Sequence, residues 1–143
     1  VSTAPPPPGL CALPLNSTLP ICIQFLWVID IRDDTNPVPI ATFMPDRDRY
    51  IDRGKRFGAH NILEYKPGQN PWPDIIFLTY FNAGLRAVDV SDPFHPAEVG
   101  HFVPKMNFGQ PCCQSNDIGM DEEGRLYLID RNGAGMHILE YTG

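Results

Sequence analysis

The sequence predicts an all-β protein built from short antiparallel strands, and three observations lead to this fold class. Proline makes up 16 of the 143 residues, against a usual share of about 5%, and it disfavours long helices because it fixes φ and removes a backbone donor. Short apolar runs alternate with turns rich in Gly, Pro, Asn and Asp. No segment carries a long apolar stripe at helical spacing.

The expected strands follow from local composition. Residues 25–31 form a continuous apolar run before a turn-forming segment, which is typical of a buried strand. The runs 75–80 and 85–90 flank an Asn-Ala-Gly corner, where Gly84 permits the positive φ of a tight hairpin. Asp-Pro and His-Pro pairs end the second of these runs, and residues 97–102 then alternate between apolar and polar positions.

An internal repeat orders these elements. Residues 30–37 run from an aspartate to a proline, and residues 89–96 do the same 59 positions later (30 to 89, 37 to 96). An alternating segment follows each proline and ends at Phe43 and at Phe102. Both copies therefore predict a strand, a Pro-rich turn and a half-buried strand.

A second correspondence links the later units. Residues 59–62 align with 115–118, and 75–90 align with 125–141, with one extra residue in the second corner. The acidic corner at 121–124 predicts another hairpin. Four short strands repeated at roughly 40–60 residues are the signature of a β-propeller blade. We therefore expect four-stranded antiparallel blades, two to three of them in this chain, as part of a larger ring.

Two regions differ in composition. Residues 1–24 are predicted to be a Pro/Cys-rich loop or insertion, and residues 25–143 to hold the propeller blades. The first residue is not Met, and no signal peptide is visible at the start. No apolar run is long enough to predict a membrane span. The net charge of -6 argues against nucleic acid or an anionic membrane as partner.

Three segments carry a family resemblance. Residues 26–43 and 84–102 resemble the LVIVD repeat, in which an apolar-Asp strand precedes an Asp-Pro-x-x-Pro turn, and residues 127–143 are similar to the closing blade of such proteins. The resemblance covers about 25–143 and implies a β-propeller that is secreted, periplasmic or at the cell surface. The sequence departs from the family pattern in two places: Glu140 stands where the repeat has Asp, and the first unit lacks its opening strands.

A ring of blades closes with about four to eight units, more than this chain supplies. We expect the remaining blades to come from missing sequence, from a partner chain or from self-association. An unclosed array would leave apolar faces and strand edges exposed.

Four polar residues are predicted to line the central channel as a ligand-binding site, because they occupy equivalent places on the innermost strands: His60, Asn61, Asn116 and Asp117. His60 is also the candidate ligand of a divalent metal ion or a general base. The alternative is that His60 bonds a neighbouring backbone. No catalytic residue is predicted.

Other charged residues are expected to be structural. Asp30, Asp89 and Glu140 recur at one repeat position, where a carboxylate would accept N–H bonds of the turn. Asp130 and Arg131 predict a salt bridge at a hairpin mouth. Residues 46–52 are interpreted as a charged surface loop, since they lack the glycine and closing glutamate of a calcium loop.

The cysteines leave alternatives open. Cys11 and Cys22 are spaced to close a loop by a disulfide, or to form two bridges to Cys112 and Cys113, as suits an oxidising compartment. Free or unrelated thiols are the other interpretation. A vicinal Cys112–Cys113 bridge would be strained.

Two functional hypotheses follow. The first is an extracytoplasmic propeller that binds a protein, glycan or small-molecule ligand through its channel and loops. The second is a metal-dependent propeller enzyme, a hydrolase or an oxidoreductase, with a channel site that includes His60.

Overall fold

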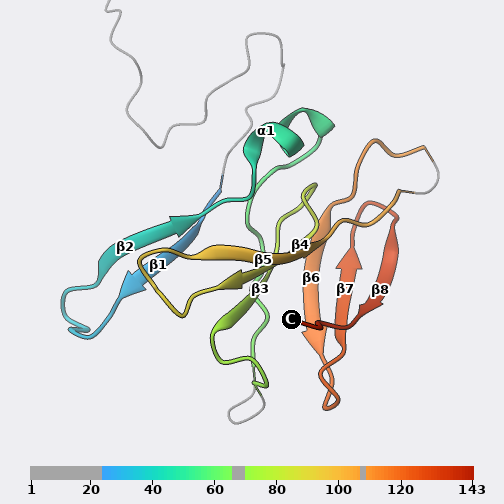
Figure 1. Cartoon of the computed structure of the whole chain (residues 1–143). Coiled ribbons are helices and arrows are strands. Elements are labelled where there is room, and N and C mark those ends of the chain that lie inside the picture. The colour runs from blue at the N-terminus through green and yellow to red at the C-terminus, as the bar shows by residue number, and fades with distance from the viewer. Residues whose placement is uncertain (1–23, 66–69, 107–108) are drawn as a thin grey trace, which may run out of the picture.

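The computed structural model describes residues 24–65, 70–106 and 109–143, in which eight strands form three antiparallel sheets (Figure 1). The prediction of an all-β chain is confirmed. The strands, in sheet order, are β1 (Leu26–Asp30) and β2 (Val38–Phe43); β3 (Ile75–Thr79), β4 (Leu85–Asp89) and β5 (Ala97–Phe102); and β6 (Ser115–Met120), β7 (Leu126–Asp130) and β8 (Gly135–Leu139).

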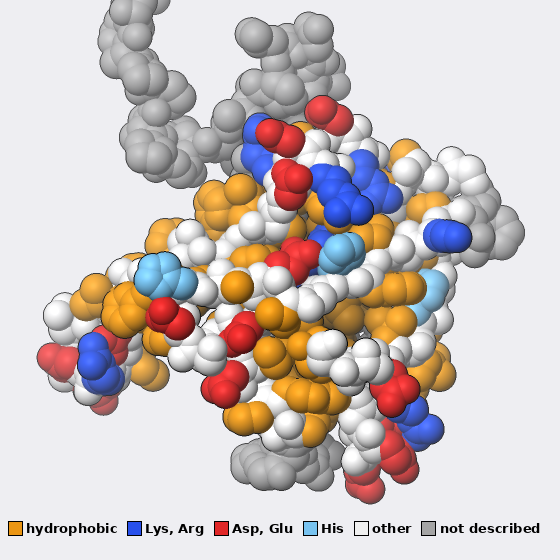
Figure 2. Space-filling model, in the orientation of Figure 1, with side chains coloured by type: hydrophobic (Ala, Val, Ile, Leu, Met, Phe, Trp, Pro, Cys, Tyr) orange, Lys and Arg blue, Asp and Glu red, His pale blue; other side chains and the backbone are white. Residues whose placement is uncertain are grey.

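One short helical segment departs from the expected surface loop at 46–52. It consists of α1 (Arg47–Tyr50) and the 3₁₀ turn η1 (Ile51–Arg53). The Asp46 carboxylate caps it by accepting from the Asp48 N–H at 3.1 Å, and the charged side chains stay at the surface, where Figure 2 shows them gathered over this segment. No helix in the described residues has the length and apolar character needed to span a membrane.

The expectation of four strands per sheet is met only in part. Within the described residues the first sheet has two strands and the other two have three. The middle sheet gains a short fourth segment, because residues 60–63 lie along β3. There the His60 N–H donates to Thr79 O at 2.9 Å and the Leu63 N–H to Phe77 O at 2.9 Å.

The repeat at an offset of 59 extends to details of the backbone. The β1–β2 register shifts between Val28 and Ile29, and the β4–β5 register shifts at the equivalent place, between Ala87 and Val88. The turn after each strand is built by the same bonds, since the residue three places after the first strand, Asp33 or Asp92, accepts two backbone N–H groups in both copies. The two copies, which share two aspartates and the final proline, therefore form the same bulge and turn.

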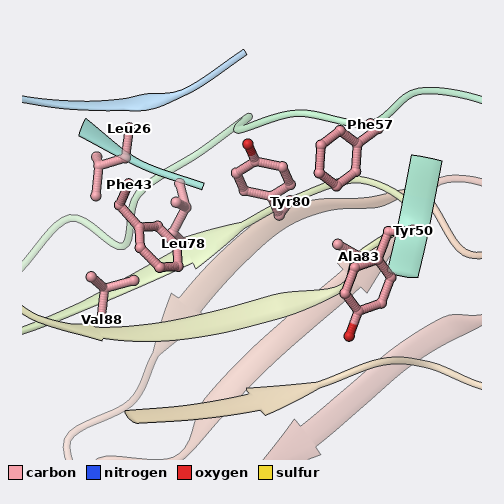
Figure 3. Packing of buried hydrophobic residues seen from close by; sticks show 8 residues of the cluster. All are labelled: Leu26, Phe43, Tyr50, Phe57, Leu78, Tyr80, Ala83 and Val88. Carbon is pink, nitrogen blue, oxygen red and sulfur yellow. The ribbon is translucent and has the colours of Figure 1, made fainter. Parts of the chain in front are cut away.

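The three sheets pack face to face, with the second sheet in the middle. One apolar cluster lies between the first and second sheets and extends to α1; Figure 3 shows its members Leu26 and Phe43 against Leu78 and Val88. A second cluster, which includes Phe77 and Leu128, lies between the second and third sheets. Strands β3 and β4 are therefore buried on both faces, which explains their nearly continuous apolar sequence.

The outward faces of the two outer sheets carry exposed apolar side chains. On β1, Trp27 is 55% exposed and Ile29 is 48% exposed. On the third sheet, Met136 and Ile138 are each 58% exposed, and Met136 pairs across the strands with Ile129. Contiguous apolar positions of this kind are unusual on a solvated surface and typically mark contact sites.

Candidate functional site

The candidate site lies where the second and third sheets meet. The segment 60–63 continues along β3, and an isolated antiparallel bridge joins Phe81 to Ser115 at the start of β6. The buried Thr79 hydroxyl accepts from the Asn61 N–H at 3.0 Å and lies 3.2 Å from the carbonyl oxygens of both Asn61 and Asn116. This hydroxyl holds the two segments in contact.

The structure brings together all four residues predicted to line a channel: His60, Asn61, Asn116 and Asp117, called the polar cluster below. The His60 ring lies 2.7 Å from the Asn116 carbonyl oxygen, and the Asn61 amide donates to the Asp117 carboxylate at 3.0 Å. His60 and Asp117 are exposed, and the two asparagines are half-buried. Equivalent positions in the repeat are thus direct neighbours in space.

The bond to Asn116 determines the tautomer of His60. A carbonyl oxygen only accepts, so His60 Nδ1 must carry the proton. In the neutral ring, Nε2 then keeps its lone pair. The backbone partner anticipated for His60 is present, and it orients the ring with one acceptor nitrogen left for another group.

Two further residues, Phe81 and Arg131, complete the surroundings of the cluster, and sequence reasoning did not select Phe81. Phe81 adopts a φ of 38°, a conformation that is rare for a non-glycine residue. The centre of its ring lies 4.7 Å from the centre of the His60 ring and 4.7 Å from the Arg131 guanidinium carbon. No sequence signal would have identified Phe81, because its role depends on an unusual backbone angle.

Arg131 does not form the predicted salt bridge with Asp130. Its guanidinium donates to the Asn116 side-chain oxygen at 3.0 Å. The Asp130 carboxylate, only 7% exposed, accepts backbone N–H groups of Gln114, Asn132 and Ala134. The salt-bridge prediction was wrong because the buried turn supplies several N–H donors that satisfy the carboxylate without a cation.

A metal centre finds no support in the described part of the chain. No group of three or more His, Cys, Asp and Glu side chains is placed there to hold an ion, whereas zinc needs at least three protein ligands. His60 has amide neighbours and one carboxylate nearby, a set better suited to hydrogen bonding than to coordination.

The recurrent carboxylates lie at strand ends. Asp30 accepts from the Arg32 N–H at 3.0 Å and Asp89 from the Ser91 N–H at 2.8 Å. Hydrogen bonds from the Arg32 side chain lower the pKa of Asp30, and the backbone bond from Ser91 lowers the pKa of Asp89. Glu140 is exposed and accepts no such bond from the described residues.

The cysteine predictions have separate outcomes. Cys11 and Cys22 lie outside the described residues. Cys112 and Cys113 are buried free thiols, and no disulfide is present within the described ranges. Their sulfurs lie near the carbonyls of Gly54 and of Phe81, at 3.0 and 3.6 Å. Burial raises the pKa of both thiols, that of Cys113 to about 11, so neither is an activated nucleophile near neutral pH.

Comparisons with protein-family models, with curated proteins and with solved structures found no match. The resemblance to the LVIVD repeat therefore stays a prediction.

Proposed function

We propose that this chain belongs to an extracytoplasmic β-propeller that binds a ligand through the polar cluster. The observation that carries the proposal is the contact of His60 with Asn116 and of Asn61 with Asp117 at the junction of two repeated sheets. Face-to-face packing of the sheets and the repeated bulge agree with successive blades. The location outside the cytoplasm rests on the family resemblance.

The proposal includes further β-sheets that complete the ring. Among the described residues, strand β1 pairs with β2 alone, whereas its repeat equivalent β4 has strands on both sides. A hollow of about 660 Å³ lies at this end of the first sheet, lined by residues that include Leu26, Trp27 and His60. The β1 edge, which no described strand covers, and the apolar outward faces are the places where additional strands and blades would pack, from further sequence, a partner chain or another copy.

The completion proposal predicts self-association of the chain when nothing else covers these faces. Sedimentation velocity should show mass that increases with concentration, because exposed apolar sheet faces bury one another. Trp27→Ser combined with Met136→Ser should reduce this association without unfolding the chain, since both side chains are more than half exposed. A monomer at every concentration, with no binding of a dye specific for apolar surface, would contradict the proposal.

The chemistry of the polar cluster fits a ligand that forms several hydrogen bonds. His60 Nε2 and the Asp117 carboxylate are acceptors, and the half-buried amides of Asn61 and Asn116 offer both donors and acceptors. Such a set suits hydroxyl or amide groups, as found in glycans, peptides and small polar molecules. Because the groups are held by bonds to one another, little side-chain ordering is needed on binding.

The ligand proposal is tested with thermal-shift screening of the chain against glycans, peptides and small polar compounds. Asn61→Ala and Asn116→Ala should each weaken a ligand found in this way by about ten-fold, the effect of losing one well-made hydrogen bond in a site. Asn36→Ala is the matched control, because Asn36 lies in an exposed turn away from the cluster. Equal affinity in all three variants would place the ligand elsewhere and refute the role of the cluster.

A further inference from the structure

A second cavity lies between the helical segment and the chain that follows β5. It has a volume of about 490 Å³, and the residues that line it include Arg49, Tyr50, Arg53, Val103, Pro104 and Lys105. We call it the cationic hollow. None of its lining residues belongs to the polar cluster, and its size lies within the range of small-molecule sites.

The hollow concentrates positive charge in an acidic protein. Three cationic side chains line it and no carboxylate does, although the chain has 17 acidic and 11 basic residues. None of the three forms a salt bridge among the described residues, and residues 1–23, 66–69 and 107–108 contain no Asp or Glu. The nearby Glu98 is already engaged by Arg86 and His101. Three like charges with no ion-pair partner among the described residues raise the local potential and favour an anion.

Two of the three cations, Arg49 and Arg53, are held in place by the fold. The Arg53 guanidinium donates to the Asn82 carbonyl at 3.1 Å, so its side chain is anchored to the β3–β4 corner. The guanidinium carbons of Arg49 and Arg53 lie 5.4 and 5.6 Å from the centre of the Tyr50 ring, within the range of cation–π attraction. Fixed arginines form paired hydrogen bonds with an oxyanion at little entropic cost.

Unsatisfied polar groups accompany the hollow. Tyr50 is 3% exposed, and its hydroxyl has no hydrogen-bond partner among the residues that the structure describes. The same is true of Nε of the buried Arg86, whose guanidinium carbon lies 4.6 Å from the centre of the Tyr50 ring. Buried polar groups without partners are uncommon in folded proteins and call for an explanation. These two groups would be explained if the side chains of the hollow rearrange when an anion binds, so that both groups then form hydrogen bonds.

We propose that the cationic hollow binds a small molecule that carries an oxyanion, a phosphate or a carboxylate, next to an apolar portion. Arg49, Arg53 and Lys105 neutralise the oxyanion. The half-buried Val103 contacts the apolar portion. The inference does not depend on the ligand of the polar cluster, because the two sites share no residue.

The test is isothermal titration calorimetry of the whole chain with pyrophosphate and, separately, with tricarballylate, each at constant ionic strength set by sodium chloride. At least one should bind, and the tighter one identifies the oxyanion as phosphate or carboxylate. Arg49→Gln and Lys105→Gln should each weaken binding by about ten-fold, the effect of losing a charge-assisted bond. Both residues are exposed, so the fold is expected to be retained, as circular dichroism would verify.

Arg47→Gln is the matched control, because Arg47 lies on α1 outside the hollow and pairs with Asp48. It should bind either anion as the unmodified chain does. No binding beyond the effect of sodium chloride, or an equal loss in Arg47→Gln and Arg49→Gln, would overturn the proposal, since the effect would then come from diffuse surface charge.

Discussion

Replacement of Gly84 by alanine is expected to lower the free energy of unfolding by at least about 3 kcal/mol. Gly84 has a φ of 81°, and a Cβ there would lie 2.2 Å from Phe102 O and 2.9 Å from Val103 Cα. A left-handed conformation alone costs roughly 1–2 kcal/mol for a residue with a Cβ. The clash adds to this cost, because the atoms that the Cβ would meet belong to the backbone at the end of β5, and β4 and β5 must separate to remove the overlap. Urea denaturation followed by circular dichroism measures the effect.

Gly133→Ala separates the two contributions. Gly133 also has a positive φ, 99°, but nothing lies within 4 Å of the position that a Cβ would take. This variant should therefore lose only the conformational part, about 1–2 kcal/mol. Equal losses in the two variants would show that the close approach at Gly84 has no energetic weight.

Asn82→Ala is expected to cost about 2–4 kcal/mol of stability and to loosen the helical segment. Asn82 is fully buried, and its amide donates to Tyr50 O at 3.1 Å and to Gly54 O at 3.0 Å. Truncation leaves two carbonyls without this donor, and each lost buried bond costs about 1–3 kcal/mol. Denaturation gives the global loss, and hydrogen exchange should become faster over residues 47–57.

The exposed Asn36→Ala variant serves as the control and should change stability by no more than about 0.5 kcal/mol. If Asn82→Ala lowered stability without faster exchange at 47–57, the amide would not be what fastens this segment to the hairpin corner.

Much of the local structure could be predicted from the sequence. The strands, their hairpins and the equivalence at an offset of 59 agree with the structure, because period-two alternation and Gly, Pro and Asp turns act through neighbouring residues. The helical turn at Arg47–Tyr50 was missed, since one turn capped by Asp46 is too short to show a helical stripe. The sequence predicted four strands in each sheet, but within the described residues the first sheet has two strands and the third has three.

The candidate site was predictable in its members but not in its contacts. The repeat selected His60, Asn61, Asn116 and Asp117, yet it could not show which of them would pair. It also missed Phe81, which depends on a positive φ.

The sequence by itself determined an all-β chain of repeated strands and turns, because these features depend on residues a few positions apart. Only the tertiary structure decided that His60 bonds Asn116, 56 residues later, and that Arg49 and Lys105 line one hollow. Such contacts depend on how whole sheets and loops pack against each other, and small differences in packing decide which side chains meet.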